Sequence, residues 1–196
     1  MYRRFRLKVP QERYFRNPAR KRREPAPKKL SLGKAELHDI DFQCLLLMSL
    51  TSVYIHIVFR TKSSVPAISL EHSEKLYGYI WGISKNLGVN LLRINGMEDH
   101  IHLFVKLPPR ISLSEFVRGV KANSSRWAKE SGYFPNFSGW ATEYAAFSYS
   151  EKDKDVVVNY IRTQREHHKK TSMKEELETL CKEFGLSDKI PYFLKD

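Results

Sequence analysis

Two histidines stand two residues apart in an otherwise apolar segment, His100 and His102 in "HIHLFVKL" (100–107). A β-strand places such residues on the same face, about 7 Å apart by rise, so both imidazoles could bind one metal ion. Two ligands alone hold a divalent ion poorly, so a metal site here needs a third. The alternative is that both imidazoles are only hydrogen-bonded on a half-exposed sheet face.

A third ligand is available in "VVVNYIRTQREHH" (156–168), where Tyr160 and Gln164 stand four residues apart. In an α-helix this spacing puts both side chains on one face. Gln164 can offer an amide oxygen with the Tyr160 hydroxyl beside it. His167 and His168 could assist or replace Gln164, and we rank them below it. Alternatively, Tyr160 is a packing residue and Gln164 an ordinary solvent-facing one.

Hydrophobic periodicity predicts the elements that must position these residues. The predicted strands are 52–59, 89–94, 100–107 and 144–150. Four helices are predicted: the first at about 76–87, the second beginning after its N-cap Ser112, the third at 151–168 and the fourth at 172–184. The order is that of a ferredoxin-like βαββαβ fold, an α+β antiparallel sheet with helices on one face and an added C-terminal tyrosine-bearing helix. The first and third strands should lie side by side, with His56, His100 and His102 on the face away from the first two helices.

Charge is spread unevenly over the 196 residues, whose formal net charge is +12. Residues 1–30 hold 12 Lys or Arg and only two Glu. We expect residues 1–47 to be a disordered, dispensable basic arm, with Met48 as the natural start, and residues 48–196 to be a single domain. The excess of positive charge favours a polyanionic partner, nucleic acid above all, although blocks of like charge are often merely solvated tails.

Cysteine content and hydropathy exclude other classes of protein. Only two cysteines occur, Cys44 and Cys181, so a disulfide framework or a zinc ribbon is excluded. A structural zinc protein is also disfavoured, for want of a plausible fourth ligand. No apolar run reaches membrane length, and no nucleotide-binding loop occurs. We expect a cytoplasmic protein without a membrane segment or a nucleotide cofactor.

These motifs resemble those of the single-tyrosine HUH transposases of small insertion sequences (IS200-like) and the related repeat-associated tyrosine transposases. His100-Ile101-His102 matches the family's His-hydrophobe-His on a central strand, and Tyr160 with Gln164 matches its nucleophile and third ligand. Other blocks follow in the family's order: "VYIHIVF" (53–59), "INGMEDHIHLFVKLPP" (94–109), "VKANSSRW" (120–127) and "GWATEYAAFSYS" (139–150). The resemblance covers about residues 48–190.

The resemblance implies a prokaryotic DNA transposase. His100, His102 and Gln164 would hold Mg²⁺ or Mn²⁺, and Tyr160 would attack single-stranded DNA at hairpin ends, giving a 5′-phosphotyrosine link and a free 3′-OH. It also implies a homodimer that joins sheets across an edge. The loop 149–152 is short, so we expect a symmetric dimer in which each site could be completed by the partner's tyrosine helix. The alternative function is a non-catalytic nucleic-acid-binding module on the same fold.

Several other residues are weaker candidates. His56 could touch DNA, orient a metal ligand or be structural. Arg118, Lys121 and Ser125, with Lys129, form a polar helix stripe that could track a phosphate backbone or simply be solvated. Glu98 and Asp99 are explained adequately by a turn.

Overall fold

The computed structural model describes residues 50–195, so the predicted basic arm 1–47 lies outside the described residues. The strands are β1 (Tyr54–Arg60), β2 (Asn90–Gly96), β3 (His100–Lys106) and β4 (Ala145–Tyr149). The α-helices are α2 (Ser73–Asn86), α3 (Leu113–Glu130), α4 (Lys154–Arg162), α5 (Gln164–His167), α6 (Met173–Glu183) and α7 (Ile190–Leu194). The strand boundaries lie within two residues of the predicted ones.

The four strands form one antiparallel sheet in the order β2-β3-β1-β4. β1 and β3 therefore lie side by side in the middle, as predicted, and in their register Val58 faces His102 and Arg60 faces His100. Together with the helices that follow β1 and β3, this topology confirms the ferredoxin-like α+β fold.

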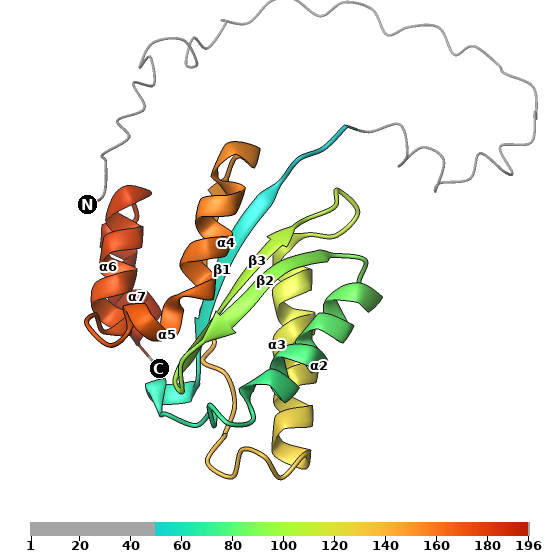
Figure 1. Cartoon of the computed structure of the whole chain (residues 1–196), viewed down its shortest axis with the longest axis vertical. Helices are drawn as coiled ribbons and strands as arrows, with labels where there is room; N and C mark the ends of the chain where they lie inside the picture. Colours follow the sequence, from blue (N-terminus) through green and yellow to red (C-terminus); the bar gives the residue numbers. More distant parts are fainter. Residues whose placement is uncertain (1–49, 196) are drawn as a thin grey trace, which may run out of the picture. The chain divides into compact units, whose positions relative to one another are not determined.

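The two faces of the sheet carry different layers (Figure 1). One face packs against α2 and α3 to form the main hydrophobic core, in which Ile57 from β1 and Leu103 from β3 are fully buried. The other face lies under α4 to α7 and carries two smaller apolar clusters around Phe104 and Phe147. Because side chains alternate along a strand, burying Ile57 and Leu103 on the first face turns His56 and His102 to the second.

Local signals explain where the helices begin and end. Gly88 adopts φ 64° just after α2, a conformation that favours glycine at the end of a helix. Ser112, the predicted N-cap, forms a capping box with Glu115 at the start of α3, and Ser150 forms another with Asp153 just before α4.

The predicted continuous helix 151–168 is wrong in detail. Residues 151–153 form a 3-10 turn, α4 follows, and the chain departs from helical geometry at Thr163 (φ −94°, ψ 14°) before α5. The Thr163 hydroxyl donates to the carbonyls of Asn159 (3.1 Å) and Tyr160 (3.2 Å). Such local side-chain bonds compete with helix geometry and bend the chain. Between residues 50 and 195, no helix has both the length and the apolar character needed to cross a membrane.

Candidate functional site

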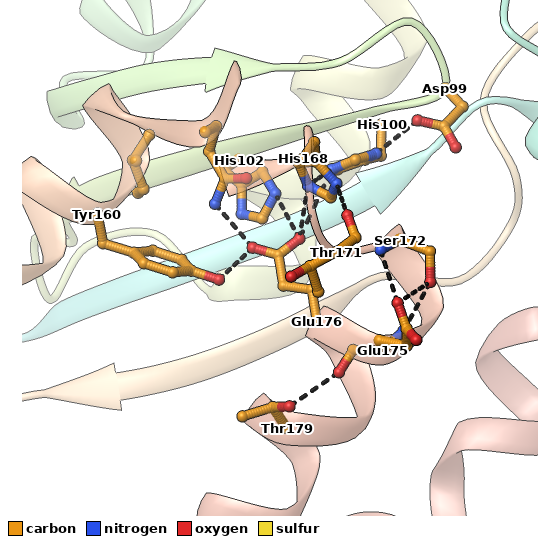
Figure 2. A network of polar contacts seen from close by, with 12 residues as sticks. Asp99, His100, His102, Tyr160, His168, Thr171, Ser172, Glu175, Glu176 and Thr179 are labelled. Carbon is orange, nitrogen blue, oxygen red and sulfur yellow. Dashed lines mark hydrogen bonds and ion pairs between the residues drawn. The ribbon is translucent and has the colours of Figure 1, made fainter. Parts of the chain in front are cut away.

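His100 and His102 project from β3 into the space between the sheet and the C-terminal helices (Figure 2). Both are buried, with 1% and 0% of their surface exposed. His168, just after α5, and Glu176, on α6, reach the same place. One ligand atom from each of these four residues lies within 4.8 Å of the others, so the four could hold a metal ion.

The Glu176 carboxylate is the centre of this group. Its Oε2 lies 3.0 Å from His168 Nε2, 3.5 Å from His102 Nε2 and 3.7 Å from His100 Nε2. Its Oε1 accepts hydrogen bonds from the Tyr160 hydroxyl and, at 2.7 Å, from Gln164 Nε2. The carboxylate therefore lies between the phenol and amide on one side and the three imidazoles on the other (Figure 2).

Tyr160 and Gln164 reach the site although the helix breaks between them. The phenol ring of Tyr160 lies with its centroid 6.4 Å from that of His102. Asn95 on β2 helps to fix this arrangement, because its Nδ2 donates to the last carbonyls of α4, Ile161 O at 2.9 Å and Arg162 O at 3.1 Å. The structure thus brings together His100, His102, Tyr160 and Gln164 within one chain, so no exchange of helices with a partner is needed to assemble them.

The outer nitrogen of each imidazole has its own partner. His100 Nδ1 lies 2.6 Å from Asp99 Oδ1, and His168 Nδ1 lies 2.8 Å from the carbonyl of Thr171. A neighbouring imidazole, His56, places its Nε2 2.9 Å from His102 Nδ1. If Nδ1 carries the proton in His100 and His102, their Nε2 lone pairs face the interior, as in metal sites whose ligands are oriented by outer hydrogen bonds. His168 differs, because its Nε2 lies 3.0 Å from Glu176 Oε2 and can donate a hydrogen bond to it.

Two buried polar atoms test whether the site fits a cation. His102 Nε2 and Gln164 Oε1 have no hydrogen-bond partner among the described residues. His100 Nε2 and His168 Nε2 lie only 3.1 Å apart, which is unfavourable for two lone pairs unless a cation or proton lies between them. Since buried polar atoms are normally paired, this set of nitrogen and oxygen donors fits a divalent metal ion.

Burial and charge set the protonation of these groups. Burial lowers the pKa of His100, although the Asp99 carboxylate opposes the shift, and burial also lowers the pKa of His56 well below its ordinary value. Burial opposes ionisation of Glu176, yet the facing His102 and the hydrogen bonds from His168 and Tyr160 hold its pKa below the usual range. Burial opposes protonation of His168, yet its hydrogen bond to the Glu176 carboxylate raises the pKa of His168. An ionised carboxylate and neutral imidazoles are the forms that bind metal ions, so metal binding requires His168 to give up the proton that it directs at Glu176.

The remaining predicted residues divide between the two faces. His56 stands in the site, against His102. Arg118, Lys121 and Ser125 lie on α3, on the opposite face of the sheet, where Lys121 Nζ donates to the carbonyls of Thr142 (2.7 Å) and Glu143 (3.3 Å). The structure does not bring these three residues to the histidines, and their contact with DNA stays a prediction.

Three residues were missed or ranked too low. Asp99, explained above as part of a turn, orients His100, and His168 lies in the cluster although we ranked it below Gln164. Glu176 was overlooked, and with it the fourth donor that was thought to be lacking. Its signal was its place beside the apolar stripe of α6, whose buried residues are Glu176, Leu177, Leu180 and Cys181.

The chain is similar to transposases in each comparison with known proteins. The family model described as "Transposase IS200 like" matches residues 49–164. The ISDra2 transposase TnpA of Deinococcus radiodurans is 23% identical over an alignment of 118 residues, and the match covers 57% of this chain and 83% of that protein. Among solved structures, a candidate transposase from D. radiodurans aligns with a TM-score of 0.49 and 22% identity, over 60% of this chain and 94% of that one. A REP-associated tyrosine transposase bound to a REP hairpin aligns with a TM-score of 0.47 and 14% identity, over 61% of this chain and 70% of that one.

The family match covers only some of the residues in the site. His100, His102, Tyr160 and Gln164 fall inside residues 49–164, with Gln164 at its end. His168 and Glu176 fall outside it. The cluster therefore combines residues of the matched region with two donors from the segment that follows.

Proposed function

The chain belongs to the family of IS200-like transposases, and from this premise we propose that it nicks and rejoins single-stranded DNA at insertion-sequence ends through a covalent tyrosine intermediate. The observation that carries the proposal is the convergence of a tyrosine hydroxyl with buried imidazole nitrogens whose outer nitrogens are already engaged. The transposase family is a family of DNA-processing enzymes. The single-stranded substrate, the nucleophile and the metal are the proposal.

Tyr160 is the proposed nucleophile. Its phenol oxygen attacks the scissile phosphorus, the bond from phosphorus to the 3′ oxygen breaks, and a 5′-phosphotyrosine link forms. The phenol loses its proton and the departing 3′ oxygen gains one, so the products are the protein–DNA diester and a free 3′-OH. One phosphodiester is exchanged for another, so no nucleotide cofactor is required, and attack by the free 3′-OH of a second strand rejoins the DNA.

His100, His102 and Gln164 are proposed to hold Mg²⁺ or Mn²⁺ in the reacting complex. When bound there, the ion supplies Lewis-acid activation of the scissile phosphate and of its leaving oxygen. His56 and Asp99 keep the two imidazoles in the tautomer that presents Nε2. Gln164 Oε1, which has no hydrogen-bond partner within residues 50–195, is the oxygen donor. Three protein ligands leave positions open for phosphate and water.

The further proposals concern partners. We propose hairpin-forming single-stranded ends as the substrate, the cytoplasm of a prokaryote as the place of action, and a homodimer as the assembled form. A non-catalytic nucleic-acid-binding module is the competing function. It has no use for a tyrosine hydroxyl held beside a cluster of buried side chains that could bind a metal ion, and this observation favours the enzyme.

A gel assay for covalent protein–DNA adducts tests the proposal. Single-stranded oligonucleotides covering the DNA that flanks the gene are incubated with Mn²⁺ and with the intact chain, with Tyr160→Phe or with Tyr133→Phe. Tyr133 is the matched control because it packs against His72 and the main core, on the face of the sheet away from the site. We expect adduct from the intact chain and from Tyr133→Phe, and none from Tyr160→Phe, with oligonucleotide binding retained. Adduct formed by Tyr160→Phe would rule out this nucleophile.

A further inference from the structure

A carboxylate from outside the family's matched region occupies the space between the proposed nucleophile and the metal-binding nitrogens. Glu176 lies on α6, beyond residue 164 where the family match ends, and only 3% of its surface is exposed. Oε1 holds the Tyr160 hydroxyl and Gln164 Nε2, and Oε2 faces the Nε2 atoms of the imidazoles (Figure 2).

The reacting phosphate needs this same space. For transfer to tyrosine, phosphorus must lie about 3 Å from the phenol oxygen. A non-bridging oxygen must at the same time reach the metal that the histidines hold. A carboxylate and a phosphodiester both carry one negative charge over two oxygens, and here one carboxylate oxygen lies on each side of the required position.

We propose that Glu176 stands in for the scissile phosphate in the DNA-free protein and is displaced by it. In this closed state the metal is held by His100, His102, His168 and Glu176 Oε2, and Tyr160 is held against Oε1. The inference rests on the proposed function and adds to it a control of access to the site. The DNA phosphate must compete with a tethered anion before Tyr160 can react.

Gln164 explains how the site changes between the two states. Its amide nitrogen now donates to Glu176 Oε1 at 2.7 Å, while its amide oxygen is buried without a hydrogen-bond partner among the described residues. Once the carboxylate leaves, Gln164 Nε2 loses this acceptor, and a turned amide would present Oε1 to a metal ion held by the histidines. The closed set of ligands thus gives way to His100, His102, Gln164 and the DNA phosphate.

The first half of the test measures Mn²⁺ affinity without DNA. Calorimetric titration of the full-length chain is compared with Glu176→Gln, which keeps the side chain's size and removes its charge, and with Glu176→Ala. The matched control is Glu178→Gln, which removes one exposed negative charge from the same helix. We expect Mn²⁺ affinity to fall roughly tenfold or more in both Glu176 variants and to stay unchanged in the control.

The second half measures the initial rate of adduct formation at saturating Mn²⁺, with the same flanking single-stranded oligonucleotides. We expect Glu176→Gln to form adduct about tenfold faster than the intact chain, and Glu178→Gln to match the intact chain. In a Tyr160→Phe background, which cannot react, Glu176→Gln should also bind the oligonucleotide more tightly.

Opposed shifts, with weaker Mn²⁺ binding and faster reaction, support displacement of Glu176 by phosphate. If the Mn²⁺ affinity and the rate of adduct formation both fall, Glu176 is a permanent ligand and the inference is overturned. An unchanged Mn²⁺ affinity overturns it as well. Equal adduct rates in the intact chain and Glu176→Gln overturn this inference alone. Adduct from none of the chains, with DNA still bound, overturns the proposed function and this inference with it.

Discussion

At the scale of single residues, the chemistry depends on imidazoles whose two nitrogens have separate tasks. His102 is fully buried, with Nδ1 against His56 and Nε2 toward Glu176. An orienting hydrogen bond of this kind raises the basicity of the ligating nitrogen and fixes the ring. Loss of the imidazole should therefore remove metal binding rather than merely weaken folding.

We predict that His102→Ala lowers Mn²⁺ affinity by roughly 100-fold or more. Loss of a residue that only orients a ligand costs about 10- to 100-fold in metal affinity, and loss of the ligand itself should cost at least as much. Calorimetric titration of the folded variant checks this. His72→Ala is the matched control, because the His72 ring packs edge-on against Tyr133, away from the cluster. Unchanged affinity in a folded His102→Ala would make the imidazole structural.

The residues found from sequence and those missed differ in what positions them. His100 and His102 were predicted from the period of a strand, and Tyr160 with Gln164 from the period of a helix together with the family motif. Glu176 and His168 reach the site only through the packing of α6 and the turn after α5, which no local period encodes. Asp99 was read as a turn residue because its carboxylate contact with the adjacent His100 depends on the rotamer and not on spacing.

At the scale of elements, α4 is the part that carries the nucleophile. Val157 and Ile161, four residues apart, are buried against Tyr54 and Phe104, and Asn95 bonds to the last carbonyls of the helix. Tyr160, beside this buried stripe, is thereby held next to His102, with its hydroxyl on Glu176. Strand boundaries were predicted well because they depend on local pattern. The break at Thr163 was missed, because a threonine inside a helical pattern does not by itself reveal whether its hydroxyl will bond to the preceding turn and bend the chain.

We predict that Ile161→Ala lowers the free energy of unfolding by about 3 kcal/mol, because it leaves a cavity under α4. Val156→Ala, one helix position from the buried stripe and 67% exposed, should change it by less than about 0.5 kcal/mol. Urea denaturation of both variants measures the difference. Equal stabilities would mean that α4 is not packed on the sheet as described.

At the scale of the whole molecule, the sheet separates two tasks. One face builds the hydrophobic core with α2 and α3, and the other face builds the site with α4 to α6 (Figure 1). The βαββαβ order predicted this division, since it places two helices on one face and leaves the other free. How α6 folds back over that free face could not be predicted, because only tertiary contacts decide which surface its apolar stripe covers.

We predict a homodimer in which each chain builds its own site, joined across an outer strand, β2 or β4. A chain carrying Tyr160→Phe is mixed with one carrying His100→Ala and His102→Ala, and mixed dimers are confirmed by sedimentation and tags of different mass. We expect no restored cleavage, because Tyr160 contacts its own chain's residues. Restored cleavage would mean shared sites, and a monomer at micromolar concentration would rule out the dimer.

The most direct test of the central claim is to locate the covalent bond. The intact chain is reacted with single-stranded DNA and Mn²⁺, the DNA is trimmed by nuclease, and the tryptic peptides are sequenced by tandem mass spectrometry. The account predicts a nucleotide joined through its 5′ phosphate to the peptide DVVVNYIR (155–162), whose one tyrosine is Tyr160. A nucleotide on any other peptide, or cleaved DNA with no nucleotide on the protein, would contradict it.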